Sequence, residues 1–135
     1  MIAAVCVDDR NGMLFNRRRV SRDQAQQEDL LALCEGKKLW VGNFSAKLFE
    51  RFGDRVVVDD AFLETAGAGE IAFVEDRALS PWKEQLEGVI VYRWNREYPS
   101  DTVFDLDLTE FACKETREFP GNSHDTITCE IYVRK

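Results

Sequence analysis

The feature that most constrains the fold is a series of short apolar segments separated by helix-like stretches. Each run has the length and β-branched or aromatic character of a buried strand. Strands that alternate with helices in this way form a sheet with parallel strands and helices packed on its faces. The predicted strands are "IAAVCV" (2–7), "KKLWVG" (37–42), "RVVV" (55–58), "EIAFVE" (70–75) and "VIVYRW" (89–94).

Helices are predicted between these strands from capping residues and apolar spacing. Ser21 or Asp23 can accept hydrogen bonds from the first turn of a helix that runs to Glu35, and Gly36 can end it. Pro81 suits the first position of a later helix. The other predicted helices cover residues 44–53, 60–67 and 80–88.

The last third of the chain changes character. Residues 111–119 and 126–134 alternate or are rich in β-forming residues, and "PGNSH" joins them, which predicts a hairpin. The expected fold class is therefore α/β, with a mixed sheet flanked by helices and an antiparallel C-terminal hairpin at its edge. No repeat or linker divides the chain, so we expect a single domain over residues 1–135.

Composition narrows the class of protein. The chain has 135 residues, of which 44% are hydrophobic, and this is typical of a globular protein with a real core. Its net charge of −7 argues against broad nucleic-acid binding, which needs a basic face. No apolar run is long enough to span a membrane, and the start lacks the basic residues of a signal peptide, so we expect a cytoplasmic protein.

Cysteine and histidine are too sparse for a metal centre. The four cysteines are widely separated and are expected to be buried, reduced core thiols. A zinc site needs closely spaced ligands, and the chain has one histidine, so no metal site is predicted. That histidine, His124, is expected to hydrogen-bond locally in a turn or to lie near the cleft. The adjacent Ser123-His124-Asp125 run is no triad, because sequence neighbours cannot point at one another.

Positive charge is concentrated in "NRRRVSRD" (16–23), although the whole chain is acidic. Guanidinium groups suit phosphate and carboxylate, so this segment could hold a small anionic molecule or dock on an acidic protein surface. The alternative is a solvated loop whose charges pair with nearby acids at little gain in stability. The candidate residues are Arg17, Arg18, Arg19 and Arg22.

The order of elements, together with four local matches, resembles the dihydrofolate reductase family. The segment "IAAVCVDDRNGMLF" resembles that family's opening strand and substrate loop, and "KLWVGN" (38–43) resembles a strand that ends in Gly-Arg. The segment "YPSDTVFD" (98–105) is similar to an Asp-Thr-x-Phe motif, and "FPGNSHDTITCEIYVRK" (119–135) is similar to the terminal hairpin. The resemblance implies that family's fold and, as an expectation, NADPH-dependent reduction.

Several residues depart from the family at the NADPH site. Glu75 and Asp76 stand where the family has a Gly-Gly turn, and two carboxylates there would repel a pyrophosphate. Asn43 stands where the family's arginine grips the 2′-phosphate, while Ser45 can replace its threonine. The chain between Phe52 and Val58 is also shorter than the family's. No NADPH binding in the family's manner is therefore expected.

On the substrate side, the resemblance implies a buried carboxylate early in the first helix. Asp23 is the nearest candidate for this catalytic group, and Thr102 matches the threonine that hydrogen-bonds it directly or through a water. The Pro-Trp pair of the substrate loop is absent. Asp23 could instead serve only as a helix cap, worth roughly 0.5–2 kcal/mol.

Three functions remain open at this point. The first is a divergent dihydrofolate-reductase-like protein without NADPH-dependent activity, whose cleft binds a small anion or a partner. The second is an active reductase that binds NADPH in an altered pose and uses Asp23, and the third is an interaction module that docks through residues 17–22. The start of the chain is also similar to chains labelled ribonuclease Z, but one histidine cannot supply that enzyme's two-zinc site, so a metal-dependent nuclease is rejected.

Overall fold

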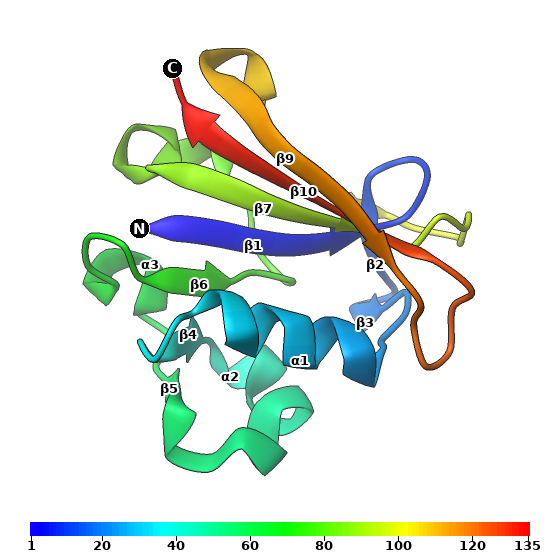
Figure 1. Cartoon of the computed structure of the whole chain (residues 1–135), viewed down its shortest axis with the longest axis horizontal. Coiled ribbons are helices and arrows are strands. Elements are labelled where there is room, and N and C mark those ends of the chain that lie inside the picture. Colours follow the sequence, from blue (N-terminus) through cyan, green and yellow to red (C-terminus); the bar gives the residue numbers. More distant parts are fainter.

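A seven-stranded mixed sheet forms the centre of the computed structural model, which describes residues 1–135 (Figure 1). The strand order is β5-β4-β6-β1-β7-β10-β9. The strands are β1 (Ile2–Val7), β4 (Leu39–Val41), β5 (Val56–Val58), β6 (Ile71–Phe73), β7 (Gly88–Arg93), β9 (Phe111–Phe119) and β10 (Ile127–Arg134).

The first five strands of that order run parallel, and β10 and β9 complete the sheet with antiparallel pairing. The predicted α/β class and the antiparallel C-terminal edge are therefore confirmed. Strand β6 lies between β4 and β1, although it follows β5 in the chain. The order of the strands therefore reverses: the chain passes from β1 out to β4 and β5 and then returns to β6. In open sheets of this kind, ligands bind outside the carboxyl ends of the strands at such a reversal.

A second, three-stranded sheet was not expected from the sequence. It has the order β3-β2-β8 and consists of β2 (Gly12–Phe15), β3 (Arg18–Arg19) and β8 (Thr102–Val103). Asn16 and Arg17 form the two-residue loop between β2 and β3, and both have positive φ, of 49° and 62°. This is the backbone of a hairpin turn that matches the twist of the strands. Strands of two residues carry too short a pattern to be read from sequence.

The helices lie between the strands that the sequence predicted, but they are shorter. Helix α1 (Gln24–Leu33) crosses one face of the sheet, as Figure 1 shows, and Asp23 caps its first turn. The predicted helix 44–53 is split into α2 (Asn43–Ala46) and the 3₁₀ segment η1 (Lys47–Arg55). The remaining elements are α3 (Phe62–Thr65), η2 (Ser80–Gln85) and η3 (Leu108–Glu110).

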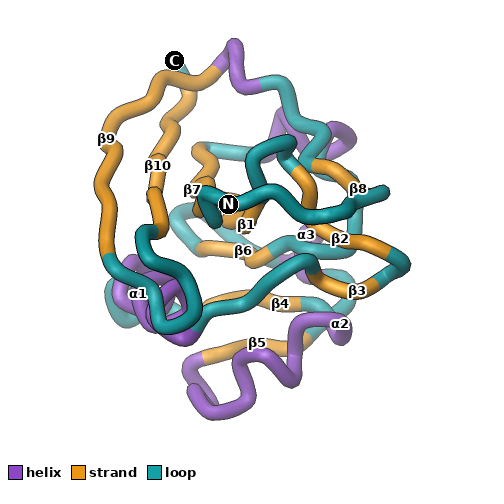
Figure 2. Tube along the Cα trace, turned by 90° about the vertical axis from the view of Figure 1, so that its right-hand side faces the viewer, coloured by secondary structure: helices purple, strands orange, loops and turns teal.

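Alternate residues of the central strands supply two separate hydrophobic cores, one on each face of the sheet. In β1, Ala3 and Val5 belong to the core that includes Phe62 of α3, whereas Ala4 belongs to the core that includes Leu30 of α1. Figure 2 shows α1 and α3 on opposite sides of the strands. Because successive side chains of a strand point to opposite faces of the sheet, each central strand contributes to both cores.

The cysteine prediction is wrong in part. Cys34 and Cys129 are buried, and all four thiols are free, but Cys113 is exposed. The reason is that β9 is an edge strand whose middle residues carry no layer above them. None of the helices has the length and apolar character needed to cross a membrane, and no cluster of acidic, cysteine or histidine side chains has the make-up of a metal site.

Candidate functional site

The four arginines of residues 16–23 do not form one cluster. Arg17 and Arg18 are exposed at the β2–β3 hairpin, whereas Arg19 turns inward. Arg22 stands apart from these three and lines a pocket beside the start of α1. The hairpin separates side chains that are neighbours in sequence, so the predicted four-arginine anion site is not assembled.

Arg19 is held by a buried carboxylate at the end of β6. Its Nε and Nη2 donate to Glu75 Oε2 and Oε1, both at 2.8 Å, and Ser45 Oγ donates to Glu75 Oε1 at 2.7 Å. Glu75 and Ser45 are both buried. The prediction that Glu75 repels anions is therefore corrected, because a bidentate guanidinium compensates its charge. Arg19 and Ser45, two predicted anion ligands, are occupied by this contact.

Asn43 is also engaged within the protein. Its backbone N–H and Nδ2 donate to the Asp60 carboxylate at 2.7 Å and 2.8 Å. Arg77 approaches the same carboxylate at 3.5 Å and contacts Asp76 at 3.3 Å. The polar groups of Asn43, at the carboxyl end of β4, are thus bonded to Asp60 of the same protein.

The carboxyl ends of β4 and β6 are where a dinucleotide's phosphates would lie in the family resembled. A pyrophosphate site needs backbone N–H donors and a close backbone approach. A β-carbon at Gly42, the nearest glycine, would lie 3.0 Å from Arg77, Asp60 and Phe62, so the protein's own side chains fill the space above it. These side chains leave no room for the close approach that a pyrophosphate needs.

Asp23 lies at the junction of α1 and the turn that joins β9 to β10. Its Oδ1 accepts from the N–H groups of Ala25 at 2.9 Å and Asn122 at 3.0 Å. Its Oδ2 accepts from the N–H of Ser123 at 2.8 Å and lies 3.0 Å from His124 Nδ1. The side chain is fully buried. These donors fill the four lone-pair positions that a carboxylate offers.

The environment keeps Asp23 ionised. Burial acts to raise the pKa of its carboxyl, but hydrogen bonds from His124 and from the backbone of Asn122, Ser123 and Ala25 outweigh burial and hold the pKa far below its ordinary value. A carboxylate in this state caps a helix and fastens a turn. It is not poised to give a proton to a substrate near neutral pH.

Asp23 and Thr102 make no direct hydrogen bond to each other. Thr102 lies in β8, where it pairs with Leu14 of the small sheet, and its hydroxyl makes no hydrogen bond to Asp23. The other polar residues buried in the first turn of α1 are Gln26 and Gln27. Both are amides, which cannot relay a proton as a carboxylic acid does.

The approach of the turn to Asp23 depends on Gly121. A β-carbon on this residue would lie 2.5 Å from Asp23 Oδ2 and 2.9 Å from His124 O, which is too close for any larger side chain. The turn "PGNSH" was predicted only as a hairpin loop, and the structure adds its contact with Asp23. Glycine at this position lets the backbone N–H groups that follow it reach the carboxylate.

His124 is a buried residue of the same turn. It is 4% exposed, and its ring stacks on Trp94 with 4.5 Å between ring centroids and 16° between planes. Its two ring nitrogens contact Asp23 on one side and Ser21 on the other. The prediction that His124 hydrogen-bonds locally is therefore wrong for its side chain, because both ring partners come from the segment before α1.

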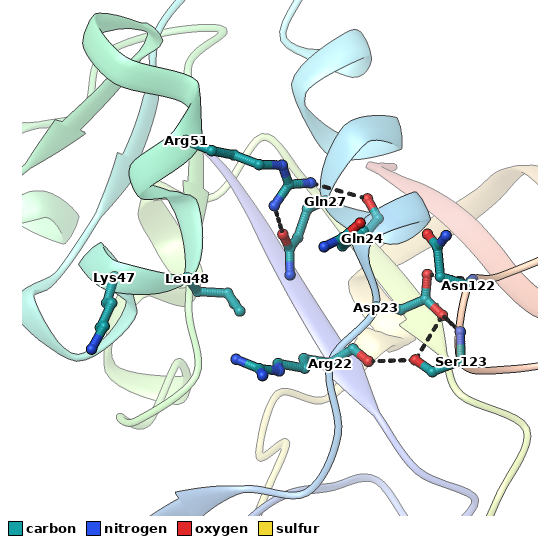
Figure 3. Close-up of a pocket in the computed structure, with 9 residues that line it drawn as sticks. All are labelled: Arg22, Asp23, Gln24, Gln27, Lys47, Leu48, Arg51, Asn122 and Ser123. Atoms are coloured by element: carbon teal, nitrogen blue, oxygen red, sulfur yellow. Dashed lines mark hydrogen bonds between the residues drawn. The ribbon is translucent and has the colours of Figure 1, made fainter.

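A polar pocket of about 350 Å³ opens beside this junction, between α1 and η1 (Figure 3). Leu48 is the only apolar residue among the nine that line it. The close-up shows the side chains of α1 facing those of η1 across the opening, with the 122–123 turn at one end. The lining residues are Arg22, Asp23, Gln24, Gln27, Lys47, Leu48, Arg51, Asn122 and Ser123.

Three cations surround the pocket without a carboxylate partner. Arg22, Lys47 and Arg51 are exposed and form no ion pair within the chain. Arg51 is oriented by Gln27, whose Oε1 accepts from its Nη1 at 2.5 Å. The one carboxylate of the lining, Asp23, is already saturated by N–H donors. The pocket is therefore electropositive on a chain of net charge −7.

Lys47 and Arg51 were missed by the sequence analysis. A signal was present, because they are four residues apart in a segment predicted to be helical and so lie on one face of it. Asn122 and Ser123 were missed for another reason. Only the folded hairpin brings them to the start of α1. Asn122, for example, contacts Asp23, which lies 99 residues earlier in the chain.

Comparison with known proteins bears on the fold. No protein-family model and no curated protein matches the sequence. Among solved structures, the chain is similar to dihydrofolate reductase from Enterococcus faecalis complexed with NADP(H) and RAB-propyl, with a TM-score of 0.66. The match covers 100% of this chain and 96% of that chain at 12% sequence identity. The protein therefore has a dihydrofolate-reductase-like fold, as the local motifs predicted, in a strongly divergent sequence.

Proposed function

We propose that this protein is a divergent dihydrofolate-reductase-like domain, residues 1–135, that binds a small anion and does not reduce substrates with NADPH. The observation that carries the proposal is the pocket between α1 and η1. Arg22, Lys47 and Arg51 surround it, and none of them is neutralised by a carboxylate of the chain.

The lining indicates the class of ligand. Two guanidinium groups offer paired donors that match phosphate and carboxylate oxygens, and Lys47 adds a point charge. Pockets for flat aromatic ligands are lined mostly by apolar side chains, but here Leu48 is the only one. A compact phosphate-bearing or polycarboxylate molecule fits this chemistry better than a pteridine ring.

Two features support the loss of reductase chemistry. The side chains of Arg77, Asp60 and Phe62 fill the space above Gly42 at the end of β4, and the Asn43 N–H, a donor of the kind a pyrophosphate needs, is already bonded to Asp60. The carboxylate at the start of α1, Asp23, has its lone pairs used by the turn at residues 122–124. The pyrophosphate site therefore lacks free N–H donors, and the carboxylate that would assist proton transfer to a substrate is already engaged.

Replacement of Arg51 by glutamine is expected to weaken anion binding by about 10- to 100-fold, since a hydrogen bond to a charged group is worth roughly 1.5–3 kcal/mol. Isothermal titration calorimetry with inorganic pyrophosphate and with citrate measures this for the wild-type chain and for Arg51→Gln. Binding is expected to weaken further with added salt, because the contacts are ionic.

Arg17→Gln is the matched control. It removes the same charge from an exposed arginine of the hairpin that does not line the pocket, so its affinity should stay within about twofold of wild type. Equal loss of affinity in both variants would show that the anion responds to net charge rather than to this pocket. That result would contradict the proposal.

An active reductase is the second candidate, favoured by one observation: the similar structure from Enterococcus faecalis is a complex with NADP(H). Thermal unfolding with NADPH and dihydrofolate distinguishes the two. An NADPH concentration a hundredfold above its Kd would stabilise a reductase by about 2.7 kcal/mol. The proposal expects no such shift and no oxidation of NADPH.

A further inference from the structure

Ser21, His124 and Asp23 are joined by hydrogen bonds, and of these three residues only Asp23 also lines the proposed anion pocket. His124 Nδ1 lies 3.0 Å from Asp23 Oδ2, and His124 Nε2 lies 2.8 Å from Ser21 Oγ. Ser21 and Asp23 come from the segment that leads into α1, and His124 comes from the β9–β10 turn. Three residue types that perform acyl transfer in hydrolases thus meet within hydrogen-bond distance.

The hydrogen-bond directions follow from the chemistry of the carboxylate. An ionised Asp23 can only accept, so the proton of the neutral His124 ring lies on Nδ1 and Nε2 has a free lone pair. Ser21 then donates its hydroxyl proton to Nε2. This is the order of donors and acceptors in which an imidazole activates a serine, with the carboxylate fixing the tautomer.

The imidazole is held rigidly. It is buried, stacked on Trp94, and fastened to Asp23 by a turn that itself donates two backbone N–H groups to that carboxylate. A fixed ring keeps Nε2 directed at Ser21, and such preorganisation lowers the cost of reaching a transition state. The hydroxyl of Tyr98 lies 3.3 Å from both His124 Nε2 and Ser21 Oγ. The contact between Nε2 and Ser21 Oγ, at 2.8 Å, is shorter, so Ser21 is the main partner of Nε2.

Donors for a developing oxyanion are also at hand. The backbone N–H groups of Ser21 and Arg22 donate to no acceptor in the chain. In hydrolases with an activated serine, the N–H of the nucleophile or of the residue after it stabilises the negative oxygen of the tetrahedral intermediate.

Ser21 is partly exposed and lies between two openings. The residue before it, Val20, lines a hollow of about 590 Å³ together with Tyr98 and Pro99. The residue after it, Arg22, lines the anion pocket. Ser21 thus lies at the surface, between two openings whose linings include its sequence neighbours but not Ser21 itself.

We propose that Ser21 is a nucleophile, activated by His124 and Asp23, that accepts the acyl group of small esters. As Ser21 Oγ bonds to the carbonyl carbon, its proton passes to His124 Nε2 and the carbonyl electron pair moves onto oxygen. When the intermediate collapses, the carbon–oxygen bond to the alcohol breaks and the alcohol takes the proton from Nε2. Water then attacks acyl-Ser21 by the same route, which releases the acid and restores the serine.

The test is acetylation of the full chain by p-nitrophenyl acetate. We expect a burst of p-nitrophenol, a gain of one acetyl group by intact mass, and peptide mapping that places it on Ser21. Ser21→Ala should abolish the burst and the label. His124→Gln should slow acetylation about 100-fold or more, the scale of general base catalysis. Thermal unfolding of both variants confirms that they are folded.

Ser80 provides the matched control. It is exposed and its N–H contacts the Asp105 carboxylate, but no histidine lies beside it, so it should stay unlabelled and Ser80→Ala should acetylate as wild type does. Labelling spread over lysines or Tyr98, or a burst unchanged in Ser21→Ala, would overturn the proposal. Since none of these measurements depends on the anion, failure here leaves the calorimetric result standing, and the reverse also holds.

Discussion

Replacing Asp23 by alanine is expected to lower the free energy of unfolding by about 3–4 kcal/mol, the largest effect of any single change we foresee. The reason is that one buried carboxylate serves both α1 and the β9–β10 turn. Its removal leaves the N–H groups of Ala25, Asn122 and Ser123 without their acceptor. Urea unfolding followed by circular dichroism measures the loss.

Asp107→Ala is the control, because Asp107 also caps a helical turn but is exposed and accepts from Thr109 N–H at 3.0 Å. Little loss of stability is expected there. The pH dependence gives a second readout. Since the folded pKa of Asp23 is depressed below its ordinary 3.8, its contribution is complete above about pH 5 and is lost as the pH falls. Asp23→Asn should lack this part of the acid sensitivity.

Equal stability of Asp23→Ala and Asp107→Ala would contradict the account of this junction. It would mean that the turn is held by the strands alone and that the carboxylate is free for another task. Asp23 would then again be a candidate for a proton relay, as the resemblance first implied.

The second large effect is expected at the Arg19–Glu75 ion pair. Arg19→Met should lower the free energy of unfolding by about 3 kcal/mol, because it leaves the buried Glu75 carboxylate with only the Ser45 hydroxyl as donor. The exposed fractions of the two side chains are 24% and 9%, so solvent does little to compensate Glu75.

A double variant separates the interaction from the individual side chains. In Arg19→Met/Glu75→Leu no buried charge remains at this position, and stability should return to within about 1 kcal/mol of wild type. The cycle is completed by Glu75→Leu alone. If the losses of the two single variants simply add in the double variant, the two groups are not coupled and the pair does not hold the hairpin against β6.

The sheet was predictable because its signal is local and repeated. The apolar run at residues 2–7 matches the bounds of β1, and the hairpin strand at 111–119 matches β9. The element boundaries that failed lie at special backbone positions. Gly53, with φ of 60°, is the last residue of the helix predicted over 44–53 and interrupts η1, which continues to Arg55. Strand β3 has only two residues, and β8 depends on a partner, β2, that is distant in sequence.

The site was much less predictable. The sequence drew attention to Arg19 and Arg22 together, but a two-residue hairpin loop turns the first toward Glu75 while the second lines the pocket. Asp23 was correctly proposed as a helix cap, yet its contacts with residues 122–124 depend on a close approach at Gly121. Local sequence patterns were enough to predict the helices and strands. The partners of the site side chains could be identified only from the folded structure.

The most direct test of the central claim is a ¹H–¹⁵N NMR titration of the chain with inorganic pyrophosphate. The account predicts that shifts concentrate at residues 22–27, 47–51 and 122–123, around the pocket of Figure 3. Shifts concentrated instead at residues 42–45 and 75–77, where the strands β4 and β6 end, would place the anion at the dinucleotide position and contradict it.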